Sequence, residues 1–350
     1  RTSHKTEMNI KRYSLWGEVE SSKDFEDRVY KNKTPSKWGK GKKSGRRFDY
    51  KRIKEKIWIK ILSKSQNMDI INRDVIFDGN YLRISLNKRE VAIWYVSGEG
   101  QIRFIILPKK IKIEDNFLEL IGLLDGEMCK KTNKKGGSAL KISNAEPLIA
   151  DYILNQFETY FKIPRGAWTA SLTINSKGIE NINEKKLKNH WSKITKIDLE
   201  RFTKTTLQPK YFSEFSDNGI IQIRYSNTLL FLIIMNILKN IRNIILSNKK
   251  YCEAYLRGLA AAEGGIIKRK NKLRMVQFGG VRKEDKAFYK KCLFQIGIDK
   301  VKEYPNRVET YGLSNFMILR RINIFKLHST RNKNFLKSLM NLQKNYGKKT

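Results

Sequence analysis

The sequence predicts an α+β fold in which one arrangement of helices and strands occurs twice. Two apolar segments, "LIGLLDGEM" at 120–128 and "LRGLAAAEG" at 256–264, each carry a glutamate near their end. A basic hairpin pattern follows each segment, and further strand patterns then alternate with amphipathic helix patterns. Self-similarity of this kind indicates an internal duplication. We therefore expect the order helix, two strands, helix, two strands, helix to occur in two copies.

The first copy is predicted to span 117–247 and to contain an insert at about 177–211 that is polar and largely helical by pattern. Its later patterns are a hairpin at 128–144, a helix at 147–161, strands at 167–175 and 220–226, and a closing helix near 228–246. The apolar run "LLFLIIM" at 229–235 is too short to cross a bilayer and is predicted to be a buried strand-to-helix element.

The second copy is predicted to span 252–345. Its later patterns are a hairpin at 266–280, a helix at 285–298, strands at 301–305 and 307–314, and a closing helix at 331–343. Helix aromatic residues such as Phe157, Tyr160 and Phe288 have the spacing of core residues in both copies.

The region before the repeats divides into two parts by composition. Residues 1–49 are polar and basic and are expected to form a flexible arm. Residues 50–110 are expected to form a small α+β module of unknown role, with an amphipathic helix at 50–66. Two hairpins should follow this helix, folded at Asp78-Gly79 and at Gly98-Glu99-Gly100.

The charge balance predicts a polyanionic partner. The chain has 72 basic and 34 acidic residues, a formal net charge of +38. This excess is larger than solubility requires, and nucleic acid rewards each lysine or arginine that neutralises a phosphate. The alternative is a solvated basic surface encoded by a lysine-rich, low-GC genome.

The cysteines and histidines exclude several classes of site. Three cysteines and three histidines are scattered without metal-ligand spacing, which excludes a disulfide framework and a zinc ribbon. The absence of paired cysteines predicts an intracellular, reducing compartment, either the cytoplasm or an organelle matrix. Nucleases that depend on clustered His and Cys residues fit poorly.

The two apolar segments predict a pair of acids that holds a metal. Gly122 and Gly258 would let the helices approach closely, which would bring Glu127 and Glu263 to the same end of a shared axis. Two carboxylates beside two negative helix ends repel each other, and a divalent cation removes the conflict. Carboxylate and backbone oxygens are suited to Mg²⁺.

These two motifs and the repeat that follows them resemble the single-chain, two-repeat LAGLIDADG homing endonuclease family over about 117–345. The resemblance implies two pseudo-symmetric αββαββα repeats whose sheets form a DNA-binding saddle over the major groove. It implies an intron-encoded, monomeric hydrolase that uses Mg²⁺ or Mn²⁺. Its water attack on the phosphodiester would cut both strands of a long DNA site and leave short 3′ overhangs.

The resemblance also implies roles for particular residues. Glu127 and Glu263 would be catalytic and would bind metal, with the backbone oxygens of Gly126 and Ala262 as further ligands. Asn144 matches a family position that helps to position water, and the matching place in the second copy falls around Gly280. The family's basic residue before the closing helix is matched most closely by His328, with Lys326 two residues earlier. Met128 replaces the usual final glycine of the first motif, which predicts strain at the turn.

Base readout is expected from the hairpins, where alternate side chains of a strand face the groove. The predicted DNA-binding residues are Lys130, Lys131, Lys134, Lys135, Lys141, Lys268, Lys270, Arg274 and Gln277. About half of them could reach bases, because the other half of a strand's side chains face away.

Two alternative functions share this fold. An intron RNA maturase would bind the RNA of its host intron and would not depend on the two acids. A catalytically inactive regulator would bind DNA without cleavage; the two retained acids argue against it, because an unneeded buried acid pair is costly.

Overall fold

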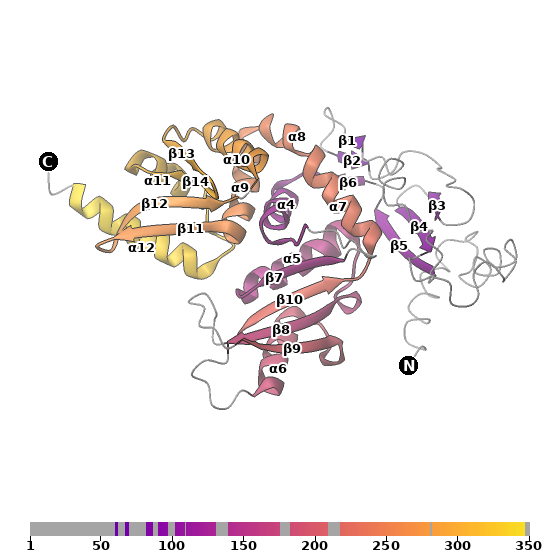
Figure 1. The fold of residues 1–350 in the computed structure, drawn as a ribbon. Helices are drawn as coiled ribbons and strands as arrows, with labels where there is room; N and C mark the ends of the chain where they lie inside the picture. Colours follow the sequence, from indigo (N-terminus) through magenta and orange to yellow (C-terminus); the bar gives the residue numbers. More distant parts are fainter. Residues whose placement is uncertain are drawn as a thin grey trace, which may run out of the picture. The chain divides into compact units, whose positions relative to one another are not determined.

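The computed structural model describes residues 60–61, 67–69, 82–86, 90–96, 102–108, 110–130, 139–175, 183–208, 218–280 and 282–346 (Figure 1). The chain divides into two compact units. In the first unit, strands β3 (Leu82–Leu86), β4 (Glu90–Val96) and β5 (Ile102–Pro108) form an antiparallel sheet in the order β3-β4-β5. The predicted arm at 1–49 and the predicted fold at Asp78-Gly79 lie outside the described residues.

The sequence before the repeats was interpreted correctly in part. The predicted strands on either side of Gly98-Glu99-Gly100 are present as the antiparallel pair β4–β5. The helix predicted over 50–66 is wrong at its described residues, because Lys60–Ile61 forms strand β1. β1 pairs with β2 (Asn67–Asp69), which pairs with β6 (Lys110–Lys112) in the second unit. The isoleucines of "KIWIKI" alternate, and this period suits a strand better than a helix.

The second repeat contains a four-stranded antiparallel sheet in the order β11-β12-β14-β13. Its elements are α9 (Lys249–Glu263), β11 (Gly264–Arg269), β12 (Lys272–Gly279), α10 (Lys283–Gln295), β13 (Val301–Tyr304), β14 (Arg307–Thr310), α11 (Leu313–Arg321) and α12 (Ser329–Tyr346). Lys270 and Asn271 join β11 to β12 with φ of 50° and 60°, the left-handed conformation that tight hairpin turns require.

The first repeat follows the same plan with an addition. Its elements are α4 (Asp115–Glu127), β7 (Leu140–Asn144), α5 (Pro147–Phe161), β8 (Thr169–Asn175), α6 (Glu184–Thr195), β9 (Phe202–Gln208), β10 (Ile220–Tyr225), α7 (Thr228–Asn240) and α8 (Arg242–Leu246). The sheet order is β7-β10-β8-β9, and β9 is a parallel edge strand beside β8.

Strand pairing fixes the correspondence between the repeats. Ile142 pairs with Met128 and with Ile223, just as Phe278 pairs with Gly264 and with Val308. Residues that occupy matching places in the two repeats can therefore be compared one by one. The predicted order helix, strands, helix, strands, helix is confirmed for both copies.

Three details depart from the prediction. The insert contains the predicted helix α6 but also strand β9, which the sequence did not reveal. The closing helix of the first repeat is divided at Ile241 into α7 and α8. The second repeat has an additional helix, α11, before its closing helix α12.

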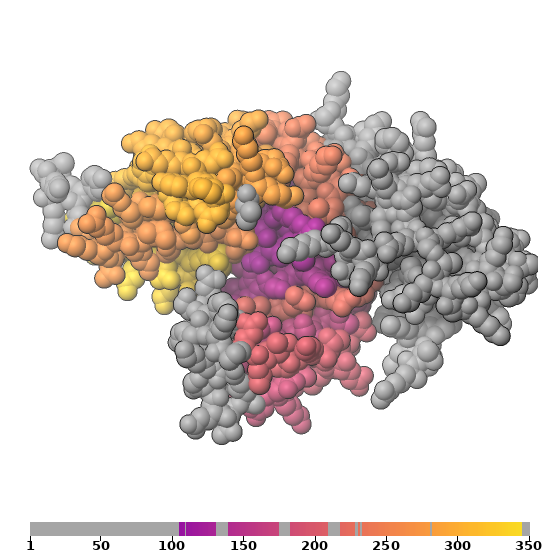
Figure 2. Space-filling model, in the orientation of Figure 1, coloured from indigo at the N-terminus to yellow at the C-terminus, as the bar shows by residue number. Residues whose placement is uncertain are grey.

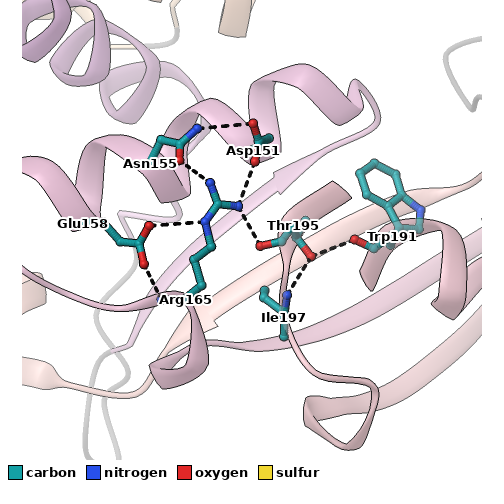
Figure 3. A network of polar contacts seen from close by, with 7 residues as sticks. All are labelled: Asp151, Asn155, Glu158, Arg165, Trp191, Thr195 and Ile197. Carbon is teal, nitrogen blue, oxygen red and sulfur yellow. Dashed lines mark hydrogen bonds and ion pairs between the residues drawn. The ribbon is translucent and has the colours of Figure 1, made fainter. Parts of the chain in front are cut away.

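A buried arginine fixes the insert to the first repeat (Figure 3). The Arg165 guanidinium, 7% exposed, donates to the Asp151 carboxylate on α5 and to the Thr195 carbonyl of α6, both at 2.7 Å. It also donates to Glu158 at 3.3 Å and to Asn155. A buried cation needs such partners, so this cluster holds α6 against α5.

The core follows the predicted apolar faces. Phe157, Tyr160 and Phe288 are buried as expected, at 0%, 6% and 5% exposure. Among the described residues, no helix is long and apolar enough to cross a membrane, and "LLFLIIM" lies within α7, a helix of 13 residues. In Figure 2 the purple atoms, which include α4, lie between those of the first-repeat sheet and those of the second repeat.

Candidate active site

Helices α4 and α9 pack side by side at backbone contact distance (Figure 1). A Cβ built on Gly122 would lie 2.1 Å from the Tyr255 carbonyl oxygen. A Cβ built on Gly258 would lie 1.9 Å from the Glu119 carbonyl oxygen. Gly122 and Gly258 occupy matching places, so the contact has pseudo-twofold symmetry. The predicted close approach of the two helices through their glycines is confirmed.

The two glutamates lie at the same end of this helix pair. Glu127 is the last residue of α4, and Glu263 is the last residue of α9. A Cβ on Gly126 would lie 2.4 Å from the Ala262 Cβ and 2.9 Å from the Glu263 Cγ, so the helices remain in contact up to their ends. The acids occupy the junction between the repeats, as the motifs predicted.

Met128 does not strain the turn after α4. Its φ of −73° and ψ of 130° are close to the −74° and 143° of Gly264 at the matching place. Any residue adopts this extended conformation, so the expected strain is wrong.

Asn144 orients the first glutamate. Its side-chain Nδ2 donates to Glu127 Oε1 at 2.8 Å, while its Oδ1 accepts the backbone N–H of Glu146 at 2.7 Å. The second contact fixes which side of the amide faces Glu127.

The second glutamate has different surroundings. The place that matches Asn144 is occupied by Gly280, as the sequence indicated. A Cβ on Gly279 would lie 2.5 Å from Glu263 Oε2, so the carboxylate packs against the Gly279 backbone. Phe278 is buried, and therefore Gly279 and the Glu263 carboxylate lie on the opposite, polar face of the sheet. The two halves of the site are thus unequal.

A cation contacts the C-terminal carbonyls of each motif helix. Lys130 Nζ donates to the carbonyl of Asp125 and, at 2.5 Å, to its carboxylate. Arg331 Nη1, from α12, contacts the carbonyl oxygens of Ala260, Ala261 and Ala262 at 3.1, 2.7 and 3.1 Å. These positive charges offset the negative helix ends beside the two glutamates.

The two residues that the resemblance suggested as cationic helpers have other contacts. Lys326 Nζ lies 2.6 Å from Glu119 Oε1, two turns of α4 before Glu127. Burial and the nearby Arg331 lower the pKa of His328 to about 4, so its imidazole is neutral at pH 7. The 3.5 Å approach to Glu146 is therefore not an ion pair, and His328 Nδ1 accepts the Arg331 backbone N–H at 3.4 Å.

The helix interface contains an asymmetric charge network. The buried Glu119 of α4 accepts from Arg257 Nε of α9 at 2.6 Å, and Arg257 also reaches Asp115 at 2.8 Å. Asp125, 4% exposed, accepts from the Tyr255 hydroxyl at 2.5 Å. Asp115, Glu119 and Asp125 thus each have a partner on α9, and this explains how these acids are tolerated between the helices.

The donor set fits a divalent cation. Two carboxylates and the helix-end carbonyls are hard oxygen ligands, as magnesium and manganese prefer. The Ala262 carbonyl already accepts an N–H from Arg331, which competes with a metal for that oxygen. Among the described residues, no group of three His, Cys, Asp or Glu side chains is placed to hold a metal, so water or substrate would complete the coordination.

The sheets place the predicted DNA-binding residues in different environments. Lys141 and Gln277 occupy matching places on the polar faces. Lys268 Nζ instead lies 3.4 Å from Asn334 of α12, on the helix-covered side. Lys270 is exposed at the hairpin turn, and Arg274 is exposed beside a bulge between Ile267 and Lys268. Lys131, Lys134 and Lys135 lie outside the described residues.

Several polar residues near the glutamates were missed. Arg331 is 68 positions after Glu263, and its contact arises from tertiary packing. Arg224 and Gln222 of β10, and Arg307 of β14, lie on the same polar faces as Lys141 and Gln277. Alternation along these strands was the available signal, because Ile221, Ile223 and Val308 are buried.

Comparison with known proteins gives partial matches to solved structures. No family model matches the sequence. No curated protein matches it either. An I-DmoI variant in complex with its nicked target DNA and Mn is 17% identical over 59% of this chain and 94% of that chain, with a TM-score of 0.32. The N-terminal LAGLIDADG domain of DUF199/WhiA is 13% identical over 59% and 81%, with a TM-score of 0.33. Mesophilic variants of the homing endonuclease I-DmoI match at 16% identity over 61% and 98%, with a TM-score of 0.30.

Two features of the chain carry its resemblance to a known family, the paired motif and the repeated unit. The two motif copies form the central helix pair, and a unit of the same order follows each of them. In these features the chain resembles the LAGLIDADG homing endonucleases.

Proposed function

We propose that this chain is a metal-dependent, site-specific DNA endonuclease that cuts both strands of its target. The observation that carries the proposal is the backbone contact of α4 with α9, which brings Glu127 and Glu263 together. Each acid ends the helix that leads into the sheet of its own repeat. The net charge of +38 supports a nucleic-acid substrate.

The residues of the chain would bind and orient the reacting groups. Asn144 holds Glu127 in a fixed orientation through its hydrogen bond. Arg331 fixes the end of α9 and adds positive charge near Glu263. A divalent cation, when bound by the two glutamates, would neutralise phosphate charge and lower the pKa of water for attack on phosphorus. The two polar faces would lie along the major groove, and cleavage would leave short 3′ overhangs.

The test is cleavage of a randomised duplex-DNA library in Mg²⁺ by the wild type, Glu127→Gln and Glu263→Gln. The matched control is Glu253→Gln, because Glu253 lies on α9, the helix of Glu263, but near its opposite end. We expect recurrent double-strand breaks from the wild type and the control, and none from the two site variants. Breaks that persist in both site variants would refute the proposal.

A regulator that binds DNA without cutting it remains a second candidate, favoured by the glycine at the place of Asn144 in the second repeat. Specific binding without cleavage by the wild type would support it. Binding only to the RNA of a host intron would support the maturase function instead.

A further inference from the structure

The polar face of the second sheet carries an arginine next to the candidate active site. Arg307 on β14 is the cross-strand partner of Gly279 on β12. Gly279 is the residue against which the Glu263 carboxylate packs. Cross-strand partners lie about 5 Å apart, so Arg307 is one strand away from the second glutamate.

Neighbouring side chains hold this arginine in one orientation. Its Nε donates to Glu309 Oε1 at 2.6 Å, and its Nη1 donates to Asn306 Oδ1 at 3.1 Å. The guanidinium also lies 4.8 Å from the centre of the Tyr304 ring. The Arg307 side chain is 37% exposed, whereas that of Glu309 is only 5% exposed. Among the described residues, no acceptor contacts Nη2.

A surface ion pair between Arg307 and Glu309 is the simplest interpretation, but two features of this pair indicate a role in binding DNA. A carboxylate on a face that meets phosphates opposes binding, unless it serves to orient a cation. A restrained guanidinium also loses less conformational entropy when it binds, and its planar fork suits bidentate contacts. Guanine presents two acceptors, O6 and N7, to such a fork in the major groove.

The first repeat differs at the matching place. Gln222 occupies the position of Arg307, and its Nε2 donates to Ser143 Oγ at 3.1 Å. Arg224 occupies the position of Glu309. The arginine and its carboxylate partner therefore occur in the second repeat only. Any base recognition that they provide is limited to one half-site of the DNA target.

We propose that Arg307, positioned by Glu309, determines specificity for a guanine in the half-site that faces the second repeat. This inference rests on the proposed function. The edge formed by Nη1 and Nη2, which Glu309 does not use, would donate to O6 and N7. Nη1 would give its second hydrogen, because its first is donated to Asn306. A lysine at this position would keep the charge but lose the planar geometry.

The experiment is a selection by binding, in which duplexes retained from a randomised library by the full chain are sequenced. Wild type, Arg307→Lys, Arg307→Ala and Glu309→Gln are compared, and thermal melting confirms that each folds. The matched control is Arg320→Ala, which removes an exposed arginine of α11 in the same repeat, outside the sheet, for which no carboxylate partner is seen among the described residues.

We expect one guanine position to lose discrimination by about 5- to 150-fold in both Arg307 variants and by less in Glu309→Gln. Arg320→Ala should leave the selected sequence unchanged. An unchanged sequence preference in Arg307→Lys and Arg307→Ala would overturn the inference, as would a wild type that selects no sequence. Because selection uses binding, a wild type that selects DNA without cleaving it would refute only the nuclease.

Discussion

The backbone contact between α4 and α9 predicts that an alanine at Gly258 is severely disruptive. The added Cβ would lie 1.9 Å from the Glu119 carbonyl oxygen, 2.8 Å from the Glu119 carbonyl carbon and 2.9 Å from the Leu123 nitrogen. All three are backbone atoms within a helix and cannot rotate away. Ordinary contact begins at 3.4 Å, so the helices must separate by about 1.5 Å.

The expected magnitude follows from packing. Overfilling a core costs about 1–3 kcal/mol, and a contact between two backbones belongs at the upper end of that range. Replacing a helical glycine with alanine stabilises the helix itself by about 1 kcal/mol, which offsets part of this cost. The net loss is therefore about 2 kcal/mol, or a fall in Tm of roughly 4–8 °C for a domain of this size.

The assay is thermal unfolding of Gly258→Ala beside Gly166→Ala. Gly166 has no atom within 4 Å of an added Cβ, so its substitution is expected to leave the Tm unchanged. Cleavage should fall in Gly258→Ala alone, because separation of the helices moves Glu263 away from Glu127. Equal melting temperatures for the two variants would refute the inferred backbone contact.

Three further substitutions test the surroundings of the site. Asn144→Ala removes the donor to Glu127 and should slow single-turnover cleavage about 10- to 150-fold, the loss of one hydrogen bond to a charged group; an unchanged rate would show that the amide is dispensable. Arg331→Ala exposes the last carbonyls of α9 and should lower the free energy of unfolding in urea by about 1–3 kcal/mol, with a smaller loss for Arg331→Lys; equal losses would mean that charge is irrelevant there. The pKa of His328 is about 4 in the fold, against 6.5 for an unperturbed histidine. The unfolded chain therefore takes up this proton more readily, so the contribution of His328 to stability is complete above pH 6.5 and is lost as the pH falls towards 4. His328→Gln should remove that part of the pH dependence, at most about 3 kcal/mol in urea titrations, and an unaltered pH profile would contradict the shift.

The repeat could be predicted because its signals are local. The motif glycines and the alternation in "LRMVQFG" each lie within one element, and periodicity reports directly which face is buried. The places of Glu127 and Glu263 followed from the same spacing, since each residue ends a helix, whereas Asn144 was identified only through the resemblance to the LAGLIDADG family.

The remaining features depend on contacts between distant segments. Lys130 begins a basic run, but the buried Asp125 draws its ammonium towards the end of α4. Strand β9 is polar, with the sequence "FTKTTLQ", and only its pairing with β8 makes it a strand. The contact of Arg331 with α9 required knowledge of where the last helix packs, which no local pattern contains.

The charge network between α4 and α9 also determines which helices can form a pair. If two copies of α4 met through their glycines, two Glu119 carboxylates would be buried and Ile121 would take the place of Arg257. If two copies of α9 met, two Arg257 guanidiniums would be buried without Glu119. Removing one partner of a buried ion pair costs about 3–5 kcal/mol. A pair of like helices would bear this cost twice, once for each unpaired Glu119 or Arg257. The interface therefore favours the pairing of α4 with α9 within one chain over the pairing of two like helices from different chains.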